Sequence, residues 1–332
     1  MFTYFFTFML ALFLCLYIIP IVKQAALQYD IVDKPDGNLK NHASPVPYLG
    51  GLAVYVSFLL TLGLTFHFSN EVLGLLLSGT IVILLGIIDD LKALSPQLKL
   101  AGQAIAILVL MKSGIYIQLI FLPLPVCLIL TFFWLMTIIN AFNIIDIMDG
   151  LSTGTALIGA LTLFGVALIN DRPMIAVLTI AMAGALLGFL RHNFATATMY
   201  LGDSGSMFIG LMLGALAMIG SYTEHNTFGC LAPLIILGIP LFDTLFVMYI
   251  RWRRGKPVIY GSPDHFALRL RKWNLSTKQT VIASYTVSAV LGGLGIVMML
   301  CPSNETAGAI VLCIIAAGLV AGYFLKKIDM TM

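Results

Sequence analysis

The chain has 332 residues, of which 60% are hydrophobic and 10% are charged, and its mean hydropathy is +1.02. A soluble domain is about half apolar and about a quarter charged, so this chain has too few polar side chains to coat a globule of its size. A soluble enzyme is therefore excluded, and a net charge of +3 is too small to indicate nucleic-acid binding. The five cysteines lie in or beside apolar runs without a CxxC pair, which indicates neither a disulfide framework nor a soft-metal site.

Apolar runs of about 18 to 25 residues recur along the chain, the length that an α-helix needs to cross about 30 Å of hydrocarbon. The first run, Phe2 to Val22, has neither a basic leading segment nor a small-residue cleavage site, so we interpret it as a retained helix. Further spans are expected near 49–68, 71–88, 98–113, 118–139, 152–169, 173–190, 205–222, 228–250, 280–300 and 306–325. The sequence thus predicts an all-α polytopic membrane protein of about eleven transmembrane helices, forming a single integral membrane domain over residues 1–332.

Basic residues predict the orientation, because short cytoplasmic loops retain Lys and Arg. With the N-terminus outside, 16 of the 18 basic residues fall on the cytoplasmic side, and only Lys112 and Arg172 fall outside. The longest cytoplasmic segment, 251–279, carries eight of them and is expected to form a basic loop within the domain. Its first arginines are also explained as a stop-transfer signal with contacts to anionic lipids. The C-terminus is expected in the cytoplasm.

Two adjacent acids, Asp89 and Asp90, end one predicted span on the cytoplasmic side. Neighbouring carboxylates repel each other, and placing them against hydrocarbon adds a desolvation cost. A cation or a proton should relieve this repulsion. The alternative for any single acid of this kind is a helix cap at the membrane interface.

Polar side chains recur at every third position after the fifth predicted span, as Asn140, Asn143, Asp146 and Asp149. On a helix, neighbours in this series would share a face and form a ladder of oxygen ligands. Farther along, Asp203 lies between glycines where a loop enters a helix, a setting suited to phosphate. Because all these ligands are hard oxygens, they favour Mg²⁺ or Mn²⁺ over zinc.

Two basic segments supply the remaining candidate site residues. His265 is a lone imidazole between a proline turn and an amphipathic stretch. Lys40 and His42 precede the pair Gly50-Gly51, which allows close helix packing, while the basic residues beside it are equally suited to an anionic ligand. The sequence contains neither a Walker-type glycine loop nor a nucleophile elbow.

Together these motifs resemble the polyprenyl-phosphate N-acetylhexosamine-1-phosphate transferases. The resemblance runs from about Asp33 to Lys278. It rests on segments in the family's order, which are Asp33-Lys34-Pro35 with Lys40, His42 and Gly50-Gly51; Asp89-Asp90 with Lys99 and Gln103; Asn140 to Gly150; Gly202 to Gly205; and Pro240 and Asp243 with the basic loop that carries His265.

The resemblance implies transfer of a sugar-1-phosphate from a UDP-N-acetylhexosamine to undecaprenyl phosphate, with release of UMP. It places this reaction at the first membrane step of cell-surface polysaccharide synthesis, such as that of lipopolysaccharide O-antigen. The enzyme would be a multi-pass protein of the bacterial inner (plasma) membrane with its active site on the cytoplasmic face. Association of two copies as a homodimer is left open.

The resemblance also assigns residues. Asn143 and Asp203 would hold Mg²⁺, with Mn²⁺ as the alternative ion. The catalytic residues would be Asp89, Asp90 and His265, with the two aspartates organising the lipid phosphate or acting as base. Substrate contacts would come from Lys40, His42, Lys99, Asn140, Asp146 and Asp149. After His265 this chain reads Phe266-Ala267-Leu268, where antigen-initiating members usually carry His-x-His-His, so the sugar donor stays open.

An ion-coupled transporter is the competing interpretation, since a cation pathway also needs intramembrane acids. Only Asp243 lies well inside a predicted span, and the other acids gather at one interface. The chain shows no duplicated half with matching broken helices. These observations favour the transferase.

Overall fold

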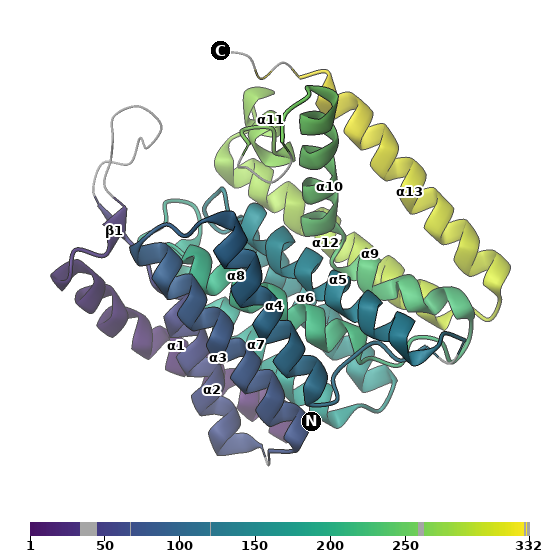
Figure 1. The fold of residues 1–332 in the computed structure, drawn as a ribbon, viewed down its shortest axis with the longest axis horizontal. Coiled ribbons are helices and arrows are strands. Elements are labelled where there is room, and N and C mark those ends of the chain that lie inside the picture. Colours follow the sequence, from purple (N-terminus) through teal and green to yellow (C-terminus); the bar gives the residue numbers. More distant parts are fainter. Residues whose placement is uncertain (34–44, 67, 120, 258–261, 329, 331–332) are drawn as a thin grey trace.

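The structure is a computed structural model that describes residues 1–33, 45–66, 68–119, 121–257, 262–328 and 330 (Figure 1). It is helical apart from two short strands, β1 (Val32–Asp33) and β2 (Val46–Pro47), which pair antiparallel. The helices are α1 (Phe2–Gln28), α2 (Gly50–Thr65), α3 (Asn70–Leu91), α4 (Pro96–Lys112), α5 (Leu124–Ile144), α6 (Leu151–Ile169), α7 (Pro173–Asn193), α8 (Gly202–Met218), the 3₁₀ helix η1 (Thr227–Leu231), α9 (Ala232–Ile236), α10 (Gly238–Arg253), α11 (Phe266–Lys272), α12 (Thr277–Leu300) and α13 (Asn304–Lys326). The expected all-α polytopic class is confirmed.

The expected count of eleven spans is not confirmed. Among the described residues, seven helices are long and apolar enough to cross a membrane, or eight if one bent pair counts as a span. Three expected spans form shorter helices, with 16 residues in α2 and 17 residues each in α4 and α8. At a rise of 1.5 Å per residue, such helices reach only about 25 Å.

Two expected spans change shape for identifiable reasons. The span near 118–139 becomes α5, which begins only at Leu124 because Pro123 is its N-cap residue and Pro125 lies in its first turn. The span near 228–250 is broken at Leu237, where Thr227–Ile236 and Gly238–Arg253 meet at an angle of 77°. Because of this break, α10 runs in a different direction from η1 and α9, and it packs against α11 and α12 (Figure 1).

Helices α7 and α8 form the centre of the molecule, with α1, α2 and α6 packed around α7 and α3 and α5 against α8. Glycines permit the closest approaches. A Cβ added to Gly51 would lie 2.1 Å from the Gly205 Cα, and one added to Gly86 would lie 2.3 Å from the Ser204 Cα. Helix α8 therefore starts in direct backbone contact with α2 and α3.

Candidate active site

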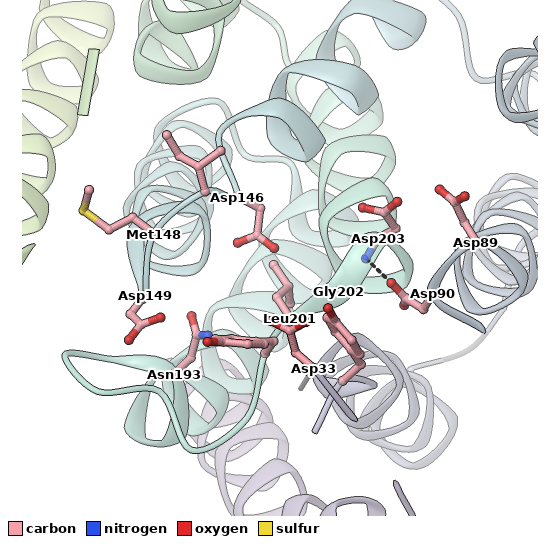
Figure 2. A pocket seen from close by; sticks show the side chains of 13 residues that line it. Asp33, Asp89, Asp90, Asp146, Met148, Asp149, Asn193, Leu201, Gly202 and Asp203 are labelled. Carbon is pink, nitrogen blue, oxygen red and sulfur yellow. Dashed lines mark hydrogen bonds between the residues drawn. The ribbon is translucent and has the colours of Figure 1, made fainter. Parts of the chain in front are cut away.

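A cavity of about 440 Å³ lies where the C-terminal end of α3, the loop after α5 and the start of α8 meet (Figure 2). Among the described residues that line it, none is Lys, Arg or His. Six aspartates do line it, namely Asp33, Asp89, Asp90, Asp146, Asp149 and Asp203. Five of these six aspartates were assigned to the site from the sequence, and Asp33 is an addition.

Asp90 is fixed to the first turn of α8. Its Oδ1 accepts a hydrogen bond from the Asp203 N–H at 2.7 Å, drawn in Figure 2, and its Oδ2 accepts one from the Ser204 N–H at 3.2 Å. A helix N-terminus carries unpaired N–H groups and a partial positive charge, both of which favour a carboxylate. Gly202 precedes them with a φ of +76°, and a Cβ there would lie 2.7 Å from Asp90 Oδ2. This glycine is thus required by backbone conformation and by space.

Lys99 on α4 bridges the two other acids at this end. Its Nζ lies 2.7 Å from Asp89 Oδ2 and 2.7 Å from Asp203 Oδ2. Asp89 also accepts the Leu94 N–H through Oδ1 at 2.7 Å, which closes the turn between α3 and α4. The Lys99 charge therefore offsets part of the repulsion that the sequence predicted between Asp89 and Asp90.

Asn143 donates from Nδ2 to Asp203 Oδ1 at 2.7 Å and to Ser206 Oγ at 3.0 Å. The structure thus joins the two residues expected to share a metal ion. Asn140 lies one turn earlier on α5, does not line the cavity, and donates to Gln103 Oε1 at 2.7 Å. Its amide stabilises the α4–α5 contact rather than meeting the cavity directly.

The ladder expected from Asn140 to Asp149 is wrong in its second half. Helix α5 ends at Ile144, so Asp146 and Asp149 lie on the loop before α6 instead of on a shared helical face. The left-handed Gly150, with a φ of +77°, then starts α6. The loop nevertheless places both aspartates at the cavity that Asp203 lines (Figure 2).

The two loop aspartates differ in their partners. Asp149 Oδ2 accepts the Ala197 N–H at 2.8 Å. Among the described residues, no group donates to the Asp146 carboxylate. Burial, followed by the negative charges of Asp203, Asp90 and Asp149, raises the pKa of Asp146 well above its ordinary value. This cavity therefore holds more negative charge than the surrounding protein neutralises.

Sequence reasoning missed Asn193, the last residue of α7. Its buried side chain accepts from the Gly150 N–H at 3.1 Å and the Thr153 hydroxyl at 2.9 Å, and donates to the Met199 carbonyl at 3.1 Å. It thereby joins the loop that carries Asp146 to the segment that leads into α8. An asparagine at the end of an apolar run carries no signal that distinguishes it from an ordinary helix terminus.

Two tyrosines, Tyr48 and Tyr200, also line the cavity, with ring centroids 6.0 Å apart. Burial, with the nearby carboxylates of Asp149 and Asp33, raises the pKa of Tyr200 to about 12. Its phenol is therefore neutral near pH 7 and offers the cavity a hydroxyl group and an aromatic face.

The donor chemistry of the cavity fits a hard divalent cation. Carboxylate and amide oxygens are the ligands that Mg²⁺ and Mn²⁺ prefer, and the Asp146 carboxylate lacks a donor among the described residues. Within that same part of the chain, no three acidic, His or Cys side chains are already close enough to hold a metal ion. Lys99 and the Asn143 amide nitrogen occupy Asp203, so both would have to turn away from its oxygens for a cation to bind there.

The remaining sequence candidates lie elsewhere. His265 has 5% of its surface exposed, does not line the cavity, and its Nδ1 lies 2.6 Å from Asp243 Oδ2. The structure therefore does not bring His265 to the aspartates that line the cavity. Lys40 and His42 lie outside the described residues.

Comparison with known proteins identifies the family. The model of glycosyl transferase family 4 matches residues 72–221. The probable undecaprenyl-phosphate N-acetylglucosaminyl 1-phosphate transferase of Bacillus subtilis (strain 168) is 31% identical over an alignment of 300 residues that covers 88% of this chain and 84% of that protein. The decaprenyl-phosphate N-acetylglucosaminephosphotransferase of Mycolicibacterium smegmatis is 32% identical over 283 residues, covering 74% of this chain and 70% of that protein.

A more distant relative shows the same kind of name. The undecaprenyl-phosphate alpha-N-acetylglucosaminyl 1-phosphate transferase of Escherichia coli (strain K12) is 23% identical over an alignment of 287 residues that covers 82% of this chain and 78% of that protein. The similarity extends on both sides of the residues that the family model matches. The chain therefore belongs to glycosyl transferase family 4, among the polyprenyl-phosphate N-acetylhexosamine-1-phosphate transferases that its motifs resemble.

Proposed function

We propose that this protein transfers N-acetylhexosamine-1-phosphate from a UDP-sugar to undecaprenyl phosphate and releases UMP. The observation that carries the proposal is the aspartate cavity, in which the family's acidic motifs converge although they are far apart in sequence. The names of the relatives support a polyprenyl-phosphate acceptor and an N-acetylglucosamine phosphate as the transferred group.

In this reaction a phosphate oxygen of the lipid attacks the β-phosphorus of the UDP-sugar. A new phosphorus–oxygen bond forms there, the bond from the β-phosphorus to the bridging oxygen breaks, and UMP leaves with that oxygen. Both reactants are anions, so their approach requires fixed positive charge. Mg²⁺, when bound in the cavity, would supply much of that charge and neutralise the leaving group.

The geometry suggests a role for each residue. Asp203 and Asn143 would hold the cation, while Asp90 keeps Asp203 in place through the first turn of α8. Lys99, once released from Asp203, would contact the phosphates. Asp89 would then organise the lipid phosphate.

The nucleotide would occupy the other side of the cavity. Asp146 and Asp149 lie there together on one loop, and Tyr200 adds an aromatic face. Asn193 holds this loop to the segment before α8. The distribution of Lys and Arg supports a cytoplasmic site in the inner membrane, because the basic segments share the cavity's side of the predicted topology.

The test is UMP release from a panel of UDP-sugars by membranes that contain the protein, with and without added undecaprenyl phosphate. We expect release that depends on the lipid, on Mg²⁺ or Mn²⁺, and on one N-acetylhexosamine donor. Asp203→Asn should abolish it. Asp171→Asn, the same change at an exposed turn between α6 and α7, is the matched control and should retain it. Solute flux without UMP release would instead support an ion-coupled transporter.

A further inference from the structure

Gln103 on α4 and Asn140 on α5 belong to the motifs that carry the family resemblance, yet neither is among the described residues that line the aspartate cavity. Their side-chain amides bond to each other instead. Asn140 Nδ2 donates to Gln103 Oε1 at 2.7 Å, and Gln103 Nε2 donates back to Asn140 Oδ1 at 3.4 Å. Gln103 is fully buried, and a buried amide is unfavourable unless such bonds replace its lost hydration.

A third side chain completes this contact between helices. Gln103 Nε2 also lies 3.2 Å from Met207 Sδ on α8, and a thioether sulfur is a weak acceptor. Asn140 Nδ2 donates in addition to the Met136 carbonyl at 2.8 Å, which ties the amide to the backbone of α5. Gln103, Asn140 and Met207, here called the amide layer, therefore join α4, α5 and α8 at one level of the fold.

Each member of the amide layer lies one helical turn from a residue of the candidate active site. A spacing of three or four residues places two side chains on the same face of a helix, about 5 Å apart along its axis. The pairs are Lys99 and Gln103 on α4, Asn143 and Asn140 on α5, and Asp203 and Met207 on α8. Lys99 Nζ and Asn143 Nδ2 each lie 2.7 Å from an oxygen of Asp203. The amide layer therefore lies directly behind the contacts of the Asp203 carboxylate.

Apolar contacts already attach α4 to the fold, so attachment alone does not require Gln103. The other buried residues of α4 are Ala106, Ile107 and Leu110, and Gln103 is the polar one among them. Apolar surfaces tolerate small shifts, whereas a hydrogen bond weakens steeply when its geometry changes. A buried polar residue can accordingly fix the register of two helices, as it does in coiled coils. What the amide pair adds is the register of α4 against α5.

We propose that Gln103 is a positioning residue. Through its pair with Asn140 it sets the register of α4 against α5, so that Lys99 and Asn143 both face the Asp203 carboxylate. This role rests on the proposed function. Gln103 itself touches no substrate, and Asn140 acts as its partner instead of as the substrate contact that the resemblance implies. A displacement of about 1 Å can cost about a hundredfold in rate, so a small error in register is enough to impair turnover.

Exchanging the two amides tests the pair. Gln103→Asn shortens one side chain by a methylene group and Asn140→Gln lengthens the other, so each single variant breaks the reciprocal bonds. The double variant keeps two amides and their summed length. We expect each single variant to lower kcat/KM for the UDP-sugar about tenfold or more, measured per folded protein. The double variant should recover to within about threefold of the parent, because the two changes compensate.

Trp134→Phe is the matched control for stability. Trp134 Nε1 donates to the Gly214 carbonyl at 2.9 Å, so this change also removes a hydrogen bond of α5, here to α8 and farther from the cavity. We expect its midpoint of thermal unfolding to fall about as far as that of Gln103→Asn, while kcat/KM stays within about twofold of the parent. The midpoint should also recover in the double variant, which reports on the amide pair without turnover.

Four results would overturn the proposal. Gln103→Asn could keep kcat/KM within twofold of the parent, or Trp134→Phe could lose as much of it, which would leave only a role in stability. A double variant that does not exceed both single variants would show that the amides act independently, as expected if Asn140 contacted substrate. A parent protein that releases no UMP from any UDP-sugar removes the proposed function and this role together, whereas an active parent with any of the other results removes only the role of Gln103.

Discussion

Asp90→Asn tests whether Asp90 positions the start of α8. The carboxylate accepts two N–H groups, from Asp203 at 2.7 Å and from Ser204 at 3.2 Å. Asparagine keeps one acceptor oxygen and replaces the other by a donor that would face an N–H group. A hydrogen bond to a charged group contributes about 1.5 to 3 kcal/mol, so we expect the free energy of unfolding to fall by about 2 kcal/mol.

The assay is thermal unfolding of the purified protein in detergent, with the rate of UMP release measured in parallel. We expect a midpoint lower by several degrees, together with a large loss of rate because Asp203 is no longer held. Glu71→Gln makes the same chemical change at the exposed, opposite end of α3 and should shift the midpoint much less. An Asp90→Asn midpoint equal to that of the parent, with a rate lower by about 10² to 10⁴, would refute the positioning argument and leave Asp90 as an acid–base group alone.

Asp203→Asn should leave the protein folded but reduce turnover below about one hundredth of the parent, and near-normal turnover at low Mg²⁺ would contradict the metal assignment. Because the pKa of Asp146 is raised in the folded state, folding favours its protonated form, and the stability of the metal-free protein should fall as pH rises from about 4 toward that raised pKa. Asp146→Asn should flatten this pH dependence of the thermal midpoint. An unchanged slope would contradict the raised pKa of Asp146. The orientation can be tested with single cysteines in a cysteine-free chain, treated with an impermeant maleimide on intact spheroplasts. Glu224→Cys should be labelled and Lys278→Cys should not, and the reverse result would invert the topology.

The helices and the acidic motifs could be predicted from the sequence because both signals are local. Apolar length placed helices such as α6, α7 and α12 within a few residues. Adjacent Asp89 and Asp90 indicated a strained acidic site before any contact was known. The partners of these acids could not be predicted from local sequence, because Asp90 meets the Asp203 N–H across 113 residues of chain.

The misplaced features depend on tertiary contacts. The three-residue spacing after Asn140 suits a helix, yet the chain leaves the helix at Ile144 and Asn193 holds the following loop from another helix. Likewise, the bend at Leu237 separates two apolar helices that hydropathy joins into one span. The pairing of Asp243 with His265 could not be inferred from either residue alone, because the two lie 22 residues apart on separate elements and meet only in the folded protein.

The most direct test of the central claim follows the β-phosphate of the donor. Membranes containing the protein are incubated with Mg²⁺, undecaprenyl phosphate and UDP-N-acetylglucosamine labelled with ³²P at the β-phosphate. Transfer of a sugar phosphate predicts that the label enters the lipid fraction while unlabelled UMP appears in solution, and that Asp203→Asn prevents both. Label that stays in solution as UDP while sugar enters the lipid would show transfer of the sugar without its phosphate and would contradict the account.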